Sequence, residues 1–247
     1  MSKAVAKTVA AVLAAAAAVV LGLEGADLLA VPPPVVAACI VVSATLAAVA
    51  TIGAAWQDWR ERRLGRRREL AEITLTATLW AVVDQVVPPL DYRDLGIAVY
   101  RTDHPWWWPW RADLRRVHRV RASRRPVSSD VAWQPGKGVI GACVSQGEVV
   151  AVDLAQMSAD LGQPTAQEWR QVPDDLRMGL EHEEYLDVRD KYAVVVATPI
   201  IDDSGSRSRV VGCLALDGPE GRLDALSSDE VLGLLNFTGQ ALLQQVG

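Results

Sequence analysis

The sequence predicts an α+β domain, an antiparallel sheet flanked by helices, preceded by a two-helix transmembrane hairpin. The first 55 residues are almost entirely apolar, with one short break. The remainder alternates between β-branched runs and helical patterns, in the order helix, three strands, helical segment, two strands and helix, which indicates about five or six strands. The expected parts are the hairpin over 1–55, a basic juxtamembrane segment over 56–68 and the α+β domain over 69–247.

The hairpin is predicted from two apolar runs, 4–23 and 35–55, each close to the roughly 20 residues that cross a bilayer as a helix. The loop between them has no Lys or Arg, whereas Lys3 and Lys7 precede the first run and several arginines follow the second. The positive-inside rule then predicts a multi-pass protein of the cell membrane with both termini cytoplasmic. A cleaved signal peptide is the alternative for the first run, although it lacks a clean cleavage site before Glu24.

Tryptophan and arginine side chains are predicted to meet the membrane interface, because indole suits a boundary between apolar and wet surroundings and arginine attracts anionic lipid. The predicted interface residues are Trp56, Trp59, Arg60, Arg62, Arg63, Arg66, Arg67, Arg68, Trp106, Trp107, Trp108 and Trp110. Net charge is +6 over 56–125 and −11 over 126–247. The basic arm after the tryptophans could therefore pair with the acidic half, and the tryptophans could cover the domain core or a second copy. A nucleic-acid partner is not expected.

The α+β domain is predicted to begin with a helix over 69–87 that two prolines end. Its apolar residues share one helical face: Leu70, Ile73, Ala77, Trp80 and Val87. Alternation in ITLTATL leaves a strand as the alternative. Strands are expected at 94–101 and 114–123, which makes the tryptophan loop the tip of a hairpin.

The later elements follow from turn and cap signals. PGKGVIGACVSQGEVVAVDL gives a turn, a short helix from Val139 that stops at Gly147, and a strand over 148–153. KYAVVVATPIID and SRVVGCLALD are strands around a Gly-Ser turn, and the last helix covers 229–246. Two capping boxes are expected, Thr165 with Glu168 and Ser227 with Glu230.

The same stretches resemble a known family. PGKGVIGACVSQGEVVAVDL resembles the central signature of GAF domains, where glycines around a turn lead into a short helix, a QG or TG stop and a strand ending in Asp. AVVVATPIIDDSGSRSRVVGCLALDGPE resembles the family's paired late strands, and LSSDEVLGLLNFTGQALLQQV its closing helix. The resemblance covers roughly residues 69–247. It implies the GAF fold, small-molecule sensing and dimerisation through the terminal helices.

Motifs for specific chemistry are not matched. No cysteine adjoins a histidine for bilin attachment, and the cyclic-nucleotide and methionine-sulfoxide-reducing motifs are not evident. PGKG lacks the glycine and hydroxyl residue of a P-loop. The carboxylates of EHEEYLD fit a solvated helix face better than acid–base work, and His182 is left as a formal haem candidate. No enzyme activity and no metal site are expected, and the cofactor is unassigned.

The predicted function is that of a membrane-anchored sensory or regulatory protein. Its cytoplasmic domain would bind an unidentified small molecule and signal as a homodimer or through partners. The candidate ligand-binding residues are Trp133, Lys137, Cys143, Tyr185, Tyr192, Thr198 and Cys213. Two alternatives stay open: a ligand-triggered effector that disrupts the membrane, and a GAF-like scaffold that binds no ligand.

Overall fold

The computed structural model describes residues 32–104, 112–123 and 129–243. The chain divides into two compact units, Met1–Arg66 and Arg67–Gly247. The elements are α2 (Pro33–Gln85), the 3-10 helix η1 (Tyr92–Asp94), β1 (Gly96–Asp103), β2 (Asp113–Arg121), α3 (Gly138–Gln146), β3 (Val150–Asp153), α4 (Leu154–Leu161), α5 (Ala166–Trp169), α6 (Asp174–Arg177), α7 (His182–Arg189), β4 (Val194–Asp202), β5 (Arg209–Gly218), α8 (Leu223–Leu226) and α9 (Asp229–Ala241).

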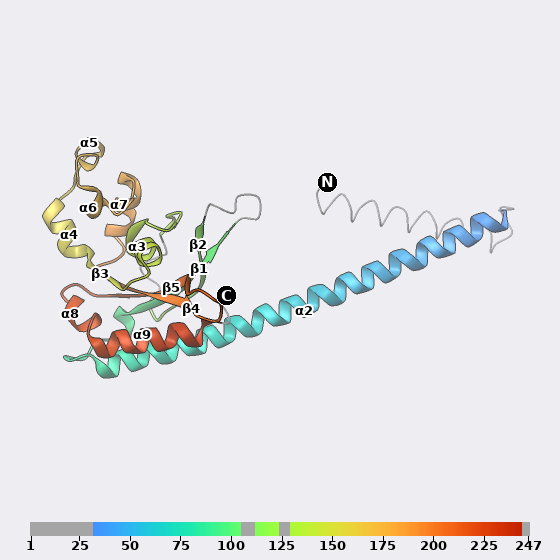
Figure 1. Ribbon diagram of the computed structural model, residues 1–247, viewed down its shortest axis with the longest axis horizontal. Helices are drawn as coiled ribbons and strands as arrows, with labels where there is room; N and C mark the ends of the chain where they lie inside the picture. Colours follow the sequence, from blue (N-terminus) through green and yellow to red (C-terminus); the bar gives the residue numbers. More distant parts are fainter. Residues whose placement is uncertain (1–31, 105–111, 124–128, 244–247) are drawn as a thin grey trace. The chain divides into compact units, whose positions relative to one another are not determined.

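The second unit is built on one five-stranded sheet with the order β2-β1-β5-β4-β3. All four strand pairings are antiparallel. Helices α2 and α9 cover one face of the sheet, and α3 to α7 lie on the other (Figure 1). The predicted α+β class is confirmed, and β1 and β2 pair as the expected hairpin. The segment between these two strands, 105–111, lies outside the described residues.

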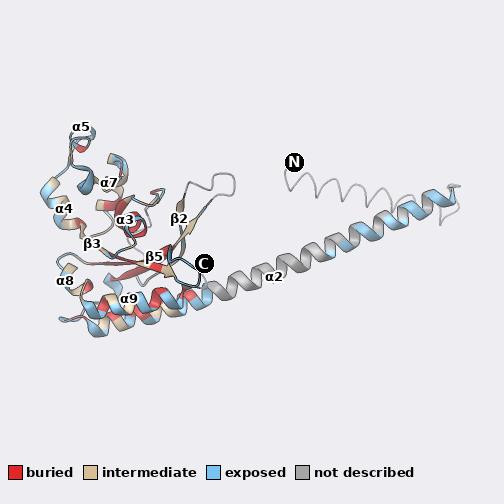
Figure 2. Cartoon of the chain, viewed as in Figure 1, coloured by how far each residue is buried: buried red, intermediate tan, exposed pale blue. Residues whose placement is uncertain are grey.

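The face of the sheet that carries α2 and α9 holds one of two apolar clusters, buried between the layers (Figure 2). Leu75 and Leu79 of α2 and Leu235 of α9 are fully buried there. A hydrogen bond crosses between the helices, with Thr78 Oγ1 and Thr238 Oγ1 2.8 Å apart. Because both hydroxyls are buried, this bond satisfies polar groups that apolar neighbours could not.

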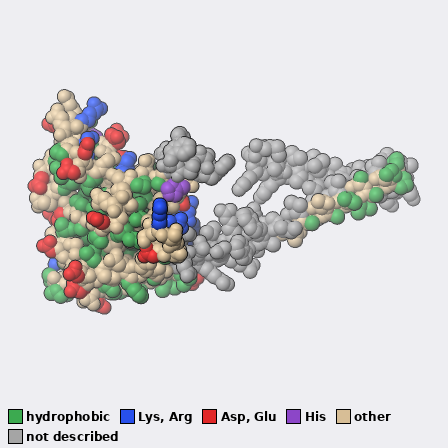
Figure 3. Space-filling view, viewed as in Figure 1, with side chains coloured by type: hydrophobic (Ala, Val, Ile, Leu, Met, Phe, Trp, Pro, Cys, Tyr) green, Lys and Arg blue, Asp and Glu red, His purple; other side chains and the backbone are tan. Residues whose placement is uncertain are grey.

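The apolar stripe named from the sequence lies on the outside of α2. The helix over 69–85 is confirmed, but Leu70, Ile73 and Trp80 are 54%, 60% and 53% exposed, whereas Leu75 and Leu79 face the sheet. This segment is apolar on two sides, so its periodicity predicts a helix without showing which side is buried. Apolar side chains consequently reach the surface along the α2 and α9 edge of the domain (Figure 3).

The prediction of a multi-pass membrane protein is wrong. Over residues 32–104, 112–123 and 129–243, the chain has no helix long and apolar enough to span a bilayer. The second predicted span, 35–55, is not a separate helix but part of α2, which continues through the arginine-rich segment. Alanine has the highest helix propensity, so an alanine-rich run favours a long helix whether or not a bilayer surrounds it. The first predicted span, 4–23, lies outside the described residues.

Most of the predicted membrane-interface residues also lie outside the described part. Trp106, Trp107, Trp108 and Trp110 fall within 105–111, and no side chain is described between 52 and 67. That second range holds Trp56, Trp59, Arg60, Arg62, Arg63, Arg66 and Arg67. Arg68 is described and exposed.

Candidate ligand pocket

The face of the sheet opposite α2 and α9 carries a row of small side chains. Cross-strand pairing places Arg119 of β2 beside Ala98 of β1. Ala98 in turn lies beside Ala215 of β5, and Ala215 beside Ala197 of β4. Paired side chains share one face and lie about 5 Å apart. Ala98 and Ala215 form part of the floor of a cavity, with the Arg119 side chain beside them, whereas the fully buried Ala197 does not line it.

The next row along the strands holds an ion pair that crosses a glycine. Arg121 of β2 and Asp217 of β5 both pair with Gly96, and their side chains form an ion pair in which each is 11% exposed. A Cβ atom on Gly96 would lie 2.5 Å from Asp217 Oδ1 and 2.7 Å from Arg121 Nε. Such distances are too short for non-bonded atoms, so glycine at position 96 lets the two charged groups meet over the middle strand.

A cover of two segments closes the space above the floor. The first is the turn before α3, where Gly138 has a φ of 61° and a Cβ atom would lie 2.6 Å from Trp133 Cζ3. The second follows α6, and its Met178 carbonyl accepts the Gly138 N–H at 2.7 Å. The cavity between floor and cover measures about 40 Å³, room for roughly three waters. Its lining residues are Ala98, Tyr100, Arg119, Trp133, Gly138, Val139, Ile140, Leu154, Met178, Leu180, Val188, Tyr192, Val195, Ala215 and Asp217.

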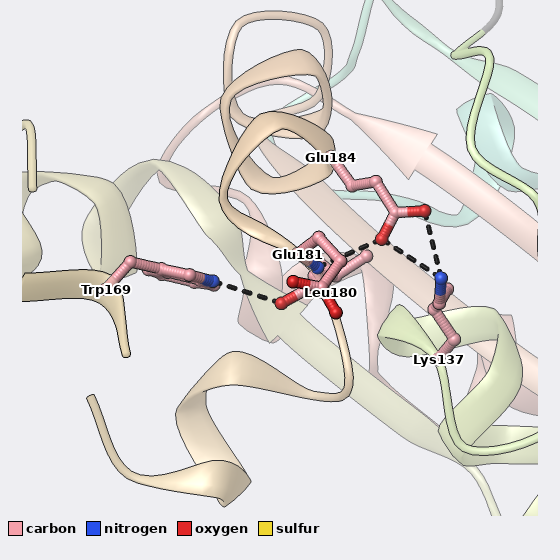
Figure 4. A network of polar contacts seen from close by, with 5 residues as sticks. All are labelled: Lys137, Trp169, Leu180, Glu181 and Glu184. Carbon is pink, nitrogen blue, oxygen red and sulfur yellow. Dashed lines mark hydrogen bonds and ion pairs between the residues drawn. The ribbon is translucent and has the colours of Figure 1, made fainter. Parts of the chain in front are cut away.

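An ion pair joins the two segments of the cover (Figure 4). Lys137 Nζ, at the start of α3, lies 2.9 and 3.0 Å from the two carboxylate oxygens of Glu184 in α7. Glu184 also accepts the backbone N–H of Glu181 at 2.9 Å, which caps the start of α7. The side chains of Lys137 and Glu184 are 19% and 22% exposed. One carboxylate therefore both begins a helix and holds it against α3.

The Trp169 side chain holds the second segment of the cover in place through two contacts. Its indole N–H donates to the Leu180 carbonyl at 3.0 Å (Figure 4). Its ring stacks on Tyr185 with centroids 4.2 Å apart. Both rings are almost fully buried. These contacts hold Leu180, which lines the cavity, in place over the floor.

One end of the cavity carries an excess positive charge. Asp217 is engaged by Arg121. The Arg119 Cζ atom lies 6.0 Å from the centroid of the Tyr192 ring, and Arg119 Nη2 is buried with no hydrogen-bond partner among the described residues. Burial, and next the charge of Arg119, lower the pKa of Arg121. Asp217 thus pairs with Arg121, while the neighbouring Arg119 has no ion-pair partner among the described residues.

Two phenols, Tyr100 and Tyr192, also line the cavity. Burial raises the pKa of Tyr100 well above its usual value, with the neighbouring Tyr192 adding to the shift. Tyr100 therefore stays protonated and can donate or accept a hydrogen bond. Away from these residues the lining is apolar, with Val139, Leu180 and Val195 among its members. The cavity is polar at one end and apolar at the other.

The structure brings two of the seven predicted ligand-binding residues into the cavity wall. Trp133 and Tyr192 line it. Lys137 lies next to it but is paired with Glu184. Tyr185 is buried below the cover against the Trp169 ring.

The other three predicted residues lie in the packed interior. Cys143 of α3 and Cys213 of β5 are fully buried neighbours, and burial together with the adjacent Cys143 thiol raises the pKa of Cys213. Thr198 is fully buried and pairs with Leu214, which belongs to the α2 and α9 cluster. Since successive strand residues face opposite sides, Thr198 lies on the far face of the sheet from the cavity.

The EHEEYLD cluster proves to be structural. Glu181 and Glu184 form a capping box at the start of α7. His182 Nε2 lies 2.7 Å from the Pro164 carbonyl oxygen, so the haem candidate makes a hydrogen bond within the cover. Among the described residues no group of three His, Cys, Asp or Glu side chains is arranged to hold a metal ion.

Sequence reasoning missed the charged end of the cavity. Arg119 was assigned to a basic arm, and Tyr100 and Asp217 were treated as ordinary strand residues. A signal was present, since Gly96 and Ala98 alternate with the bulky Ile97 and Val99 in one strand. Small residues on one face of a strand mark a place where something else comes close.

Comparisons with known proteins show similar solved structures at low sequence identity, so the chemistry of the site rests on the residues of this chain alone. No family model and no curated protein matches it. Similar solved structures include fRMsr of Staphylococcus aureus in its reduced form, at 16% identity over 74% of this chain and 95% of that chain, with a TM-score of 0.37. Others are the transcriptional regulator YaiJ (14%, 74%, 96%, 0.38) and free methionine-R-sulfoxide reductase from Neisseria meningitidis in complex with its substrate (14%, 74%, 89%, 0.34). At these TM-scores the backbones superpose only in part.

Proposed function

We propose that this chain is a regulatory protein whose GAF-like domain binds a small molecule in the cavity between the sheet and its cover. The carrying observation is the neighbouring pair Ala98 and Ala215 on the sheet, which line a cavity under α3 and the segment after α6 that large side chains do not fill. Protein interiors are otherwise packed to crystal-like density. A cavity that combines apolar walls with a few convergent polar groups is the usual form of a ligand site.

The types of residue that line the cavity fit a site that binds a ligand better than a site that catalyses a reaction. The lining residues include no Ser, Thr, Cys, His or Lys, and their one carboxylate, Asp217, is held by Arg121. Nucleophilic and acid–base catalysis most often use such a group. Of the two tyrosines in the lining, Tyr100 is held protonated by burial, which raises its pKa and suits a hydrogen-bonding role. The chain therefore acts by recognising its ligand.

Ligand binding in the cavity would change the stability of the cover, and this change would carry the signal. A ligand on the alanine floor also touches Met178, Leu180 and Val188, which belong to the segment that Lys137 and Glu184 hold to α3. A ligand that contacts floor and cover together favours the arrangement in which both are in place. The output passes to a second copy or a partner, for which the exposed apolar residues of α2 and Phe237 of α9 supply a surface.

The test is to fill the cavity from its floor. Ala98→Val adds two methyl groups to a strand position that tolerates β-branching, and Ala159→Val makes the same change at an exposed site on α4. Full-length protein is screened by saturation-transfer NMR against a library of small acids, amides and amines. We expect ligands that bind the native chain and the Ala159→Val chain but not the Ala98→Val chain. Ligands that bind all three equally, or no ligand at all, would refute the pocket.

A further inference from the structure

We propose that the pocket takes a small monocarboxylate, with its carboxylate on the Arg119 guanidinium and a short apolar tail over the alanine floor. This inference rests on the proposed function, since it names the chemical class of that ligand. It is drawn from the charges at the polar end of the cavity, the geometry of the free donor and the size of the space.

Charge balance is the first argument. The cavity is lined by one guanidinium group, Arg119, and by one carboxylate, Asp217, which forms an ion pair with Arg121 beside the lining. The Arg121–Asp217 pair crosses Gly96 and is nine-tenths buried, so Asp217 is not free to turn to Arg119. The nearby carboxylate of Glu184 is bound to Lys137. The carboxylates near this wall act on other cations, Asp217 and Asp94 on Arg121 and Glu184 on Lys137. Arg119 has no ion-pair partner among the described residues, and a ligand with one negative charge would supply one.

The state of Arg119 is the second argument. Its Nη2 atom is buried without a hydrogen-bond partner among the described residues, although the side chain lines the cavity. Its guanidinium rests near the face of Tyr192 at 6.0 Å, which stabilises a cation but accepts no hydrogen bond in the guanidinium plane. A buried donor without a partner is costly, and a ligand acceptor would remove that cost.

Shape selects a carboxylate among anions. A guanidinium presents parallel N–H groups that match the two oxygens of a carboxylate, and this planar pairing is stronger than a bond to a neutral amide. The neutral Tyr100 hydroxyl lines the same end and can donate a further hydrogen bond. A phosphate dianion would bring a second charge and further oxygens, for which this wall has no second free cation among the described residues.

Size and polarity limit the rest of the ligand. The cavity is about 40 Å³, and the lining beyond the polar end is apolar, including Val139, Leu180 and Val195 over Ala98 and Ala215. A ligand with a long chain or a second polar group would have to displace the cover. The space therefore favours a carboxylate that carries only a few carbon atoms.

The experiment compares matched acids and amides on full-length protein. Acetate, propionate and isobutyrate are titrated by saturation-transfer NMR beside acetamide, propionamide and isobutyramide, which keep the shape and lose the charge. We expect at least one acid to bind about tenfold or more tightly than its amide. We also expect Arg119→Met to lower that affinity about tenfold or more while the protein keeps its circular dichroism spectrum and melting temperature. Arg115→Met, at an exposed position of the same strand, should leave binding unchanged.

The outcomes separate this inference from the proposed function. If amides or amines bind, lose binding in the Ala98→Val chain, and no acid binds, the proposed ligand pocket stands and the proposal of a carboxylate ligand is refuted. Inorganic phosphate that binds with the same dependence on Arg119 and more tightly than any acid would also overturn it. If neither the library nor the acids respond to Ala98→Val, both proposals fall. If Arg119→Met unfolds the chain, Arg119→Lys is used, which keeps the charge but not the planar fork, and unchanged acid binding there would count against the paired geometry.

Discussion

Replacing Asp217 with Asn should destabilise the domain far more than the loss of a surface ion pair would. The side chains of Asp217 and Arg121 are each 11% exposed, so nearly nine-tenths of the pair is out of water. Removing one partner of a buried pair leaves the other charge without that partner, at a cost of up to about 3–5 kcal/mol. In a domain of this size each kcal/mol lowers the melting temperature by roughly 2–4 °C. The midpoint should therefore fall by up to roughly 6–20 °C.

A second change makes the reasoning specific to the charges. In the Asp217→Asn chain, Arg121 loses the carboxylate that pairs with it, and Arg119 already lowers the pKa of Arg121 when Asp217 is present, although Asp94 acts in the opposite direction. Arg119→Met should therefore restore part of the lost stability in that background, with a coupling free energy of about 1–3 kcal/mol. In the native background the same change removes only an unpaired cation and should be close to neutral.

The assay is thermal unfolding of the four full-length proteins, followed by circular dichroism at one pH and one ionic strength. Asp224→Asn serves as the control, because it removes a carboxylate from the short helix α8, where no ion pair is found in the described part of the chain. A loss below about 1 kcal/mol for Asp217→Asn would place the pair in the class of surface ion pairs. Further destabilisation on adding Arg119→Met would refute the repulsion argument.

Three other predictions follow from contacts elsewhere in the domain. Thr78→Val should cost about 0.5–1.5 kcal/mol, measured by urea unfolding, because it removes the hydrogen bond to Thr238, whose hydroxyl still donates to the Leu234 carbonyl. Thr78→Val and Thr238→Val together should cost less than the sum of their separate costs. Lys137→Met should speed amide hydrogen exchange in α7 without changing exchange in the sheet, because it releases Glu184 from α3. Equal exchange in the native and Lys137→Met chains would contradict the view that this ion pair holds α7 to α3. The full chain should dimerise through the exposed face of α2, so Trp80→Ser should shift the mass by light scattering towards the monomer, whereas a native monomer at high concentration would contradict this prediction.

Elements with local signals were predictable from the sequence. The helix from Val139 with a stop at Gly147 corresponds to α3, where Gly147 has a φ of 70° as a left-handed cap. The capping box of Thr165 and Glu168 is present with both of its hydrogen bonds. These features depend on residues three or four positions apart, and such patterns carry their own geometry.

Features for which the local sequence allows two alternatives, such as the exact cap of a helix or its buried side, were harder to predict. The last helix was expected to be capped by Ser227 with Glu230, but Ser228 is the cap and accepts the Val231 N–H. Only Ser227 matches the capping-box pattern, but serine can cap a helix without the glutamate, and Ser228 does so here. The same holds for α2, where Leu70 and Leu75 belong to apolar stripes on opposite sides and only the sheet shows which one is buried.

Arg119 shows why the charged end of the pocket could not be predicted from the sequence. As part of a run of arginines it was expected to face lipid, a partner or the acidic half of the chain. Arg119 reaches the cavity because it pairs with Ala98 of the neighbouring strand β1. The pairing register between β1 and β2 shifts by one residue at a bulge between Val99 and Tyr100. A shift of one residue moves a side chain to the other face of a sheet. The bulge restores Arg119 and Arg121 to the face that holds Asp217, so one irregular position decides whether an arginine lines the cavity or points away from it.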